Sequence, residues 1–436
     1  AASSEDFDEL SREDHFCSFG EELHLQNLSA RQFLQLEELQ EEQLDTFIKQ
    51  SIYRLVLHEV GHTLGLAHNF KGSLAYSTAE LESGDFNAVA STVMEYPSIN
   101  YSPVIEKNQK HLYYDIQPGV YDDFAIEYGY STALDDTEQE QKRLEKILSK
   151  ANTNSKLSFA NDAEAMRSTG SGIDPGAMVF DLSSEPLVWA KKRIDLINSL
   201  KAKLPSKYES GEYSRTELHQ GINILNGNLY TVCNIVSRYV GGVHTSRNHE
   251  QKEAAYEPVS VQDQKEAMSL LSDYFFAESA FLTDASVYEQ IRPKMRGWNR
   301  NLINEPKIVQ KVQRYHESVL KHFLHPNTLA RIQNSRYLGN AYGLNEVLSD
   351  LTDAVWNDLD DNSITKQNLI ISYLDQLIEV YTDHKKQLPM SRAAAFNQIA
   401  IIEKKANSLP SSGNLGALRS YLLLSISQTK NNKAIK

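Results

Sequence analysis

The sequence is poor in cysteine and has no long hydrophobic run. Only Cys17 and Cys233 occur among 436 residues, and they do not form a C-x-x-C pair. This excludes a disulfide framework and a thiolate metal site, although one bridge between the two cysteines stays open. The apolar runs fall far short of the ~20 residues of a membrane-spanning helix, so no span is expected. No signal peptide is visible at the first residues, because a basic and apolar leader is missing there.

Basic charge is also scarce. The chain has 44 Lys and Arg against 58 Asp and Glu, a formal net charge of −14, and its basic residues form no patch. Such a surface repels a phosphate backbone, which argues against nucleic acid as a partner. With 41% hydrophobic and 23% charged residues, the composition is typical of globular proteins. The length suits two or three domains.

The sequence does contain one long motif, H-E-x-x-H-x-x-G-x-x-H, at residues 58–68. On a helix, His58 and His62 lie on one face, one turn apart, so both imidazoles can reach one metal ion. Gly65 lets the chain leave the helix through a left-handed turn, which can bring His68 round as a third ligand. We therefore predict a metal site formed by the three histidines, with Gly65 as structural support.

The donor set predicts a catalytic zinc ion. Three protein ligands leave a fourth tetrahedral position for water, whose pKa zinc lowers to about 7. Glu59 lies beside His58 and can act as the general base. A bare H-E-x-x-H motif is common, and Gly65 and His68 at the required offsets make this one specific. An alternative in which Glu80 or Glu82 replaces His68 is less favoured, because it leaves that spacing unexplained.

A second motif follows at residues 91–97, Ser-Thr-Val-Met-Glu-Tyr-Pro. With the zinc motif, it resembles the metzincin class of zinc endopeptidases, in which a methionine-containing turn runs beneath the metal. The resemblance implies that Met94 is the methionine of this Met-turn. It also implies that Tyr96 approaches the zinc or the substrate carbonyl, where a phenol can donate a hydrogen bond to an oxyanion.

Several stretches of the sequence resemble one family in particular, the large bacterial zinc-dependent metalloproteases with a long helical C-terminal region. The shared stretches are residues 58–73, 93–97, 119–130, 173–175, 181–186 and 239–242. The resemblance implies hydrolysis of internal peptide bonds in peptide or protein substrates. It also implies export to the periplasm, the cell surface or the medium.

We predict a mainly α fold. Residues 1–130 are assigned to the C-terminal part of a zincin-like catalytic domain, 131–183 to a linker and connecting helix, and 184–436 to an irregular helical domain. Metzincins place a mixed β-sheet before the zinc helix, whereas the residues before His58 read as helix, with Leu44, Phe47, Ile48, Ser51, Ile52 and Leu55 at helical spacing. The sheet is therefore expected to be missing from this chain, and the missing N-terminal part of the same precursor is an expected partner.

Local signals predict further details. Helical patterns cover residues 28–64, 121–130, 135–151, 186–204, 217–240, 303–323, 327–336, 344–356, 365–381, 391–407 and 415–427. Pro205 is expected to stop a helix, and a capping box at Ser260 and Asp263 to start one. The polar segment from Gly242 to Glu257 is interpreted as a hairpin or a loop, and strands are expected nowhere else.

Three polar positions have competing interpretations. Asp122 or Asp123 is expected to cap a helix, with orientation of a ligand histidine as the lesser alternative. His111 is interpreted as a surface histidine rather than a fourth ligand. The acidic run at 358–362 lacks the glycine and glutamate of a calcium loop and is interpreted as a turn.

Two functions follow from these patterns. The first is a zinc-dependent metallopeptidase with Glu59 and Tyr96 as catalytic residues, which needs no cofactor beyond one zinc ion. The alternative is a non-catalytic zinc-binding or partner-binding fragment, whose cleft is completed by another chain or by the missing N-terminal region.

Overall fold

A computed structural model describes residues 18–37, 41–83, 88–102, 111–209, 215–247, 254–281, 285–291 and 306–431. The fold is mainly helical, as predicted. Within these ranges, the only strands are the short antiparallel pair β1 (Val243–Thr245) and β2 (Tyr256–Pro258), in the segment where strands were expected. No helix in the described ranges is long and apolar enough to cross a membrane.

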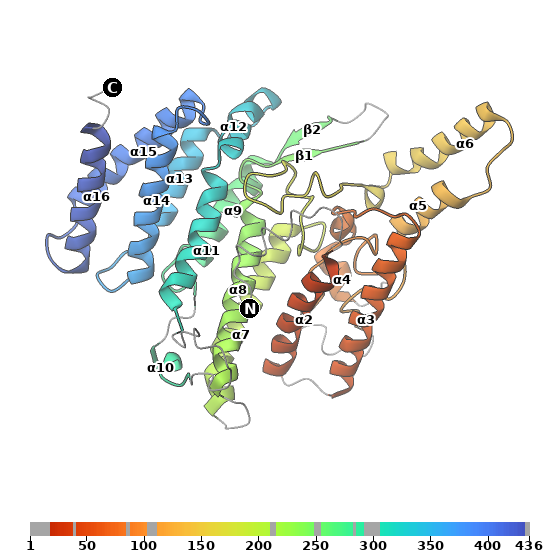
Figure 1. The fold of residues 1–436 in the computed structure, drawn as a ribbon, viewed down its shortest axis with the longest axis horizontal. Helices are drawn as coiled ribbons and strands as arrows, with labels where there is room; N and C mark the ends of the chain where they lie inside the picture. The colour runs from red at the N-terminus through yellow and green to blue at the C-terminus, as the bar shows by residue number, and fades with distance from the viewer. Residues whose placement is uncertain are drawn as a thin grey trace, which may run out of the picture.

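Two neighbouring helices open the described chain, α2 (Phe19–Leu36) and α3 (Glu41–Thr63). Glu41 and Glu42 lie in the first turn of α3, where carboxylates favour the positive end of the helix dipole. Figure 1 shows α2 between α3 and the pair α7–α8. The side-chain amide of Asn27 donates to the Ser51 hydroxyl of α3 at 2.6 Å. Helix α2 thus joins the motif helix to the helices that follow.

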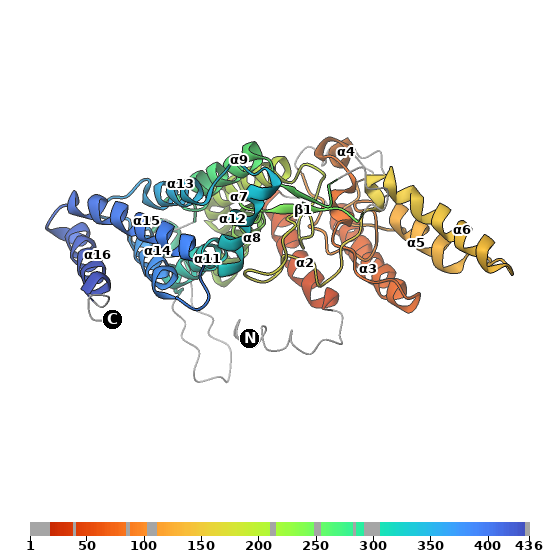
Figure 2. The same ribbon diagram turned by 90° about the horizontal axis from the view of Figure 1, so that it is seen from above.

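The chain between the motif and α7 has little regular structure. Its helices are η1 (Gly72–Ala75), α4 (Thr78–Ser83), α5 (Val120–Tyr130), α6 (Thr137–Leu148), η3 (Ser149–Asn152) and η4 (Ser155–Leu157). Helices α5 and α6 extend away from the rest of the molecule in both views (Figures 1 and 2). The other described segments in this region are irregular loops, and several of them contact α3.

The C-terminal half is a stack of helices that ends far from α6 (Figure 2). The helices are α7 (Pro186–Glu209), α8 (Arg215–Ser237), α9 (Val261–Tyr274), α10 (Ala285–Tyr288), α11 (Ile308–Phe323), α12 (Pro326–Asn334), η5 (Ser335–Leu338), α13 (Leu344–Trp356), α14 (Ile364–Thr382), α15 (Pro389–Asn407) and α16 (Gly413–Asn431). Their buried faces carry mostly leucine, valine and isoleucine. The Ser260 hydroxyl accepts from the Asp263 amide, so the predicted cap of α9 is confirmed.

Two local predictions are wrong. Pro205 does not stop α7, which continues to Glu209. Proline removes one helical hydrogen bond, but here the defect falls near the end of a helix that packs along α8. The apolar residues of α3 do not form one buried face either: Phe47 is 4% exposed, whereas Ile48 and Ile52 are 45% and 59% exposed.

Candidate metal centre

The three motif histidines meet at the C-terminal end of α3. Gly65 has a φ of +81°, the left-handed conformation expected of it. The Leu66 amide donates to the Gly61 carbonyl at 3.0 Å and the Gly65 amide to the His62 carbonyl at 3.0 Å, a Schellman ending. This ending reverses the chain, so that one ligand nitrogen from each of His58, His62 and His68 lies within 4.8 Å of the others.

Each histidine is held through its Nδ1 atom. Nδ1 of His58 lies 2.7 Å from the Val93 carbonyl oxygen, and that of His62 lies 3.1 Å from the Leu66 carbonyl oxygen. Nδ1 of His68 lies 2.9 Å from a carboxylate oxygen of Asp162. All three partners are acceptors, so each Nδ1 carries the proton and donates it. This tautomer leaves a lone pair on each Nε2.

These residues fit a metal ion. Nε2 of His62 is buried and has no hydrogen-bond partner. A buried polar atom without a partner is costly, and a metal ion would satisfy it. Neutral imidazoles that donate through the second nitrogen to a carbonyl or carboxylate are the usual arrangement around protein-bound zinc. The cluster can therefore hold one zinc ion through three Nε2 atoms.

Sequence reasoning missed Asp162, which contacts His68 from 94 positions away. The residues after His68 hold the segment that carries Asp162. The Phe70 backbone amide donates to the Ala160 carbonyl at 2.8 Å, and the Asn69 side-chain amide donates to the Ser158 carbonyl at 2.9 Å. Partial burial acts to raise the pKa of Asp162, but the hydrogen bond from His68 acts against it, and this pKa is lowered. Nothing local in the sequence distinguishes Asp162 from other acids.

Met94 packs against α3, and Tyr96 contacts the histidine cluster. Met94 is fully buried, and its sulfur lies so close to α3 that a Cβ added at Gly61 would be 2.3 Å from it. Gly61 is therefore a second structural glycine, which the sequence pattern did not single out. The Tyr96 hydroxyl lies 3.1 Å from Nε2 of His68, so this phenol faces the space between the ligand nitrogens.

Asp122 supports the segment that carries Met94. Its carboxylate accepts from the Thr92 hydroxyl at 2.6 Å, from the Val93 amide at 2.8 Å and from the Gly119 amide at 2.8 Å. The last contact caps α5, as predicted for Asp122 or Asp123. Asp122 binds the Val93 amide, and the Val93 carbonyl contacts His58, so Asp122 also positions a candidate ligand through the backbone of one residue. Asp123 is exposed.

Buried charges surround the same segment. Arg54, one helical turn before His58, pairs with Asp115 at 3.3 Å and donates to the Glu95 carbonyl at 2.5 Å. The Glu95 carboxylate accepts from the Ser73 and Tyr96 amides at 3.1 and 2.8 Å. Burial and then the charge of Asp181 raise the pKa of Glu95, and burial raises the pKa of Asp181 to about 7.

The other candidate ligands lie elsewhere. Glu80 accepts from the Ser77 amide at 2.7 Å, and Glu82 pairs with Lys192 at 2.7 Å. His111 is not a surface residue: it is 8% exposed, and its Nε2 lies 2.6 Å from the Asn100 carbonyl oxygen. Burial lowers the pKa of His111 to about 4, so it is neutral there.

Glu59 and the two cysteines lie as follows. Glu59 follows His58 on α3 and is exposed. Cys233 is buried, whereas Cys17 lies outside the described residues, and so does any pairing between the two.

Comparison with known protein families agrees with this geometry. The model of the Met-zincin family matches residues 40–363, which is most of the chain. The chain belongs to the Met-zincin family. The match includes α3, all three histidines, residues 91–97, Asp162 and the helices as far as α13. No curated protein and no solved structure matches the chain. The Met-zincin family implies zinc, and the histidine cluster is compatible with it.

Proposed function

We propose that this Met-zincin is a zinc-dependent metallopeptidase that hydrolyses internal peptide bonds. One observation carries the proposal: three imidazoles converge with every Nδ1 held by an acceptor, while the Nε2 of His62 is buried without a partner. A structural site would be closed by a fourth protein ligand. The described residues supply three, which is the donor set of a hydrolytic zinc site.

The residues around the cluster have distinct roles in this proposal. A zinc ion bound there would make water a nucleophile at neutral pH and polarise the substrate carbonyl. Glu59 takes a proton from the attacking water and passes it to the leaving amine. The Tyr96 hydroxyl donates a hydrogen bond to the carbonyl oxygen as negative charge develops on it. Asp162 keeps the His68 ring oriented.

Hydrolysis of a quenched fluorescent peptide or casein by the full chain tests this proposal, with Glu59→Gln as the decisive variant. Glutamine keeps the size of the side chain but cannot accept the proton, so kcat should fall by about 10²–10⁴-fold. Zinc content should stay at one ion per chain. Glu42→Gln, in the first turn of the same helix, is the matched control and should match wild type. Equal activity in wild type and Glu59→Gln would contradict the assignment.

A second candidate function is favoured by one surface. Ile48, Ile52, Val56, Val60 and Leu64 follow each other every four residues along α3 and are 42–59% exposed. This spacing forms a continuous apolar stripe beside Glu59. Such patches mark contact surfaces for other protein segments. The chain would then bind zinc but require another chain, or an N-terminal region of its precursor, to complete its cleft.

The same assay separates the two functions. One zinc per chain with hydrolysis that depends on Glu59 supports the peptidase. One zinc per chain without any hydrolysis supports the second candidate. In that case, Val56→Glu should abolish recovery of activity by an added partner segment. Zinc content should be unchanged, because Val56 is exposed and is not a ligand.

Substrate and location belong to the proposal as well. The substrates are peptides or proteins, and the family resemblance favours an exported protein. Fractionation of cells that make the full-length protein would test export, and recovery from the cytosol alone would contradict it.

A further inference from the structure

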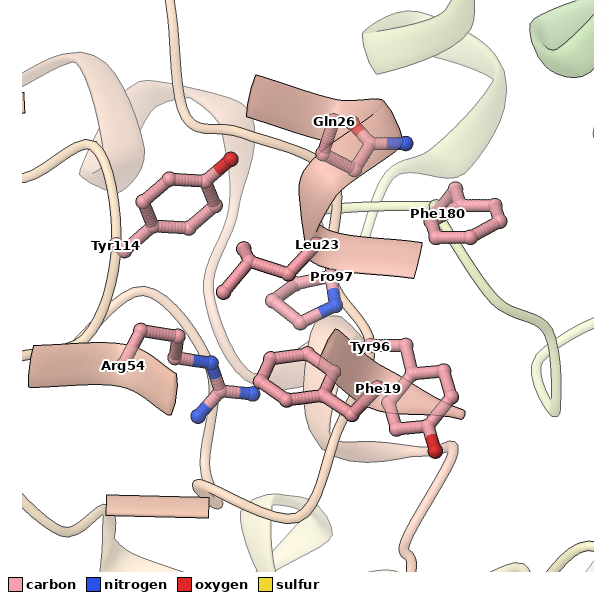
Figure 3. Close-up of a pocket in the computed structure, with 8 residues that line it drawn as sticks. All are labelled: Phe19, Leu23, Gln26, Arg54, Tyr96, Pro97, Tyr114 and Phe180. Carbon is pink, nitrogen blue, oxygen red and sulfur yellow. The ribbon is translucent and has the colours of Figure 1, made fainter. Parts of the chain in front are cut away.

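A pocket lies beside the metal centre, between α2, α3 and the segment that follows Met94. Its lining residues are Phe19, Leu23, Gln26, Arg54, Tyr96, Pro97, Tyr114 and Phe180. Figure 3 shows the Phe19 ring between the Arg54 guanidinium and the Tyr96 ring. The side chains leave no room for a water molecule in the pocket. Phe19, from the first turn of α2, is only 2% exposed.

Phe19 contacts the catalytic constellation directly. Its ring stacks on the His58 imidazole at a centroid distance of 4.1 Å and 25° between the planes. It lies 4.9 Å from the Tyr96 ring. Tyr96 in turn reaches Nε2 of His68. Phe19 thus packs against one candidate ligand and against the phenol assigned to the substrate carbonyl.

We propose that Phe19 occupies the substrate side-chain pocket of the centre, so that the first turn of α2 blocks the active site from within. This inference rests on the proposed peptidase function. A peptide whose carbonyl lies between the ligand nitrogens and Tyr96 places its neighbouring side chain against the same rings. The chain fills that position itself, and hydrolysis requires the turn that carries Phe19 to move.

The pocket also indicates which side chain it accepts. The position that the Phe19 ring fills lies against the His58 and Tyr96 rings, and Arg54 lies 5.3 Å above it. An aromatic ring between two rings and a guanidinium gains stacking and cation–π contacts that an aliphatic chain does not. We therefore assign it to substrates with an aromatic residue next to the cleaved bond.

A surface ion pair holds the blocking turn in place. Glu22, one turn after Phe19, pairs with Arg167, whose guanidinium lies 5.6 Å from the Tyr96 ring. Both side chains are partly exposed, so this pair can open without disrupting the core. Glu22 and Arg167 form the contact whose loss frees the turn.

The test compares two hydroxamates on the zinc-loaded full chain by isothermal titration calorimetry. Acetohydroxamate has no side chain to place in the pocket, whereas 3-phenylpropanehydroxamate has a phenyl ring. Phe19→Ala should raise the affinity for the phenyl compound, relative to that for acetohydroxamate, at least tenfold over the ratio in wild type. Phe33→Ala is the matched control: Phe33 is equally buried on α2 but contacts Tyr101, away from the centre, so both affinities should equal those of wild type.

A second variant covers the case in which Phe19→Ala does not fold. Glu22→Gln leaves the pocket lining intact and should improve phenyl hydroxamate binding by roughly threefold. An unchanged ratio of the two affinities in the folded variants would overturn the inference. Peptide hydrolysis by wild type that depends on Glu59, measured in the peptidase assay, would leave the proposed function standing. Failure of wild type to bind zinc would overturn both.

Discussion

The region around the metal centre and the C-terminal helical stack are built by different physical means. In the helical stack, α11–α16 pack mostly leucine, valine and isoleucine against each other. Around the centre, the described residues between 64 and 183 form short helices and loops. Charged groups such as Arg54, Glu95, Asp115 and Asp122 are buried there. The helical stack derives its stability from apolar contact, whereas the centre derives its geometry from hydrogen bonds between segments far apart in sequence.

Among the variants that test this contrast, Asp122→Ala should have the largest effect on stability and zinc binding. The change leaves the Thr92 hydroxyl and two amides without their acceptor in a buried site, at about 1–3 kcal/mol for each lost partner. We expect a loss of about 3–5 kcal/mol in the free energy of unfolding, together with weaker zinc binding, because the Val93 carbonyl no longer holds His58. Denaturant unfolding and zinc titration measure both. Asp123→Ala, at the exposed neighbour, should change neither.

Leu351→Ala is the counterpart in the helical stack. Leu351 is fully buried on α13, so the cavity should cost about 2–5 kcal/mol. Zinc affinity of the folded fraction should be the same as in wild type, because this core does not contact the centre. A comparable loss of zinc affinity in Leu351→Ala and Asp122→Ala would remove the contrast between the two regions.

Asp162→Ala separates zinc affinity from stability. Its side chain is 57% exposed, so the free energy of unfolding of the zinc-free chain should change little. Loss of the acceptor for Nδ1 of His68 should weaken zinc binding by about 10–100-fold. Asp162→Asn retains one acceptor oxygen and should lie between Asp162→Ala and wild type. A chelator-competition titration measures all three, and equal affinities would exclude the positioning role.

The last prediction is that the free energy of unfolding depends on pH through Asp181. Burial raises the pKa of Asp181 from 3.8 to about 7. The folded chain therefore binds this proton more tightly than the unfolded chain between pH 4 and 7, and stability declines as pH rises through that window. Wild type should lose more stability than Asp181→Asn over this interval. Denaturant unfolding at both pH values measures the difference. Asp195→Asn, at an exposed carboxylate of α7, should follow wild type; parallel curves for wild type and Asp181→Asn would contradict the prediction.

The same contrast explains what could be predicted from the sequence. In the helical stack, caps and apolar periodicity are local signals, and α13 begins at Leu344 and ends at Trp356 as predicted. The zinc motif is also local, because helical spacing and one left-handed glycine bring its histidines together. These features follow from neighbouring residues alone.

The supporting contacts could not be predicted in this way. Asp162 reaches His68, and Asp122 reaches Val93, only because loops fold back on α3. His111 was predicted at the surface because a histidine in an irregular segment carries no burial signal. Ile48 and Ile52 were placed with Phe47 on one helical face, but the structure exposes both, because which face of α3 is covered depends on α2 and the later loops. The domain boundaries and the roles of Glu59 and Tyr96 stay predictions.

The central claim is that His58, His62 and His68 hold one zinc ion. Elemental analysis of the purified full chain, together with His68→Ala, Glu80→Ala and Glu82→Ala, tests it most directly. We predict one zinc per chain in wild type and in both glutamate variants, and little or none in His68→Ala. A wild-type chain without zinc, or a His68→Ala chain that retains it, would contradict the account.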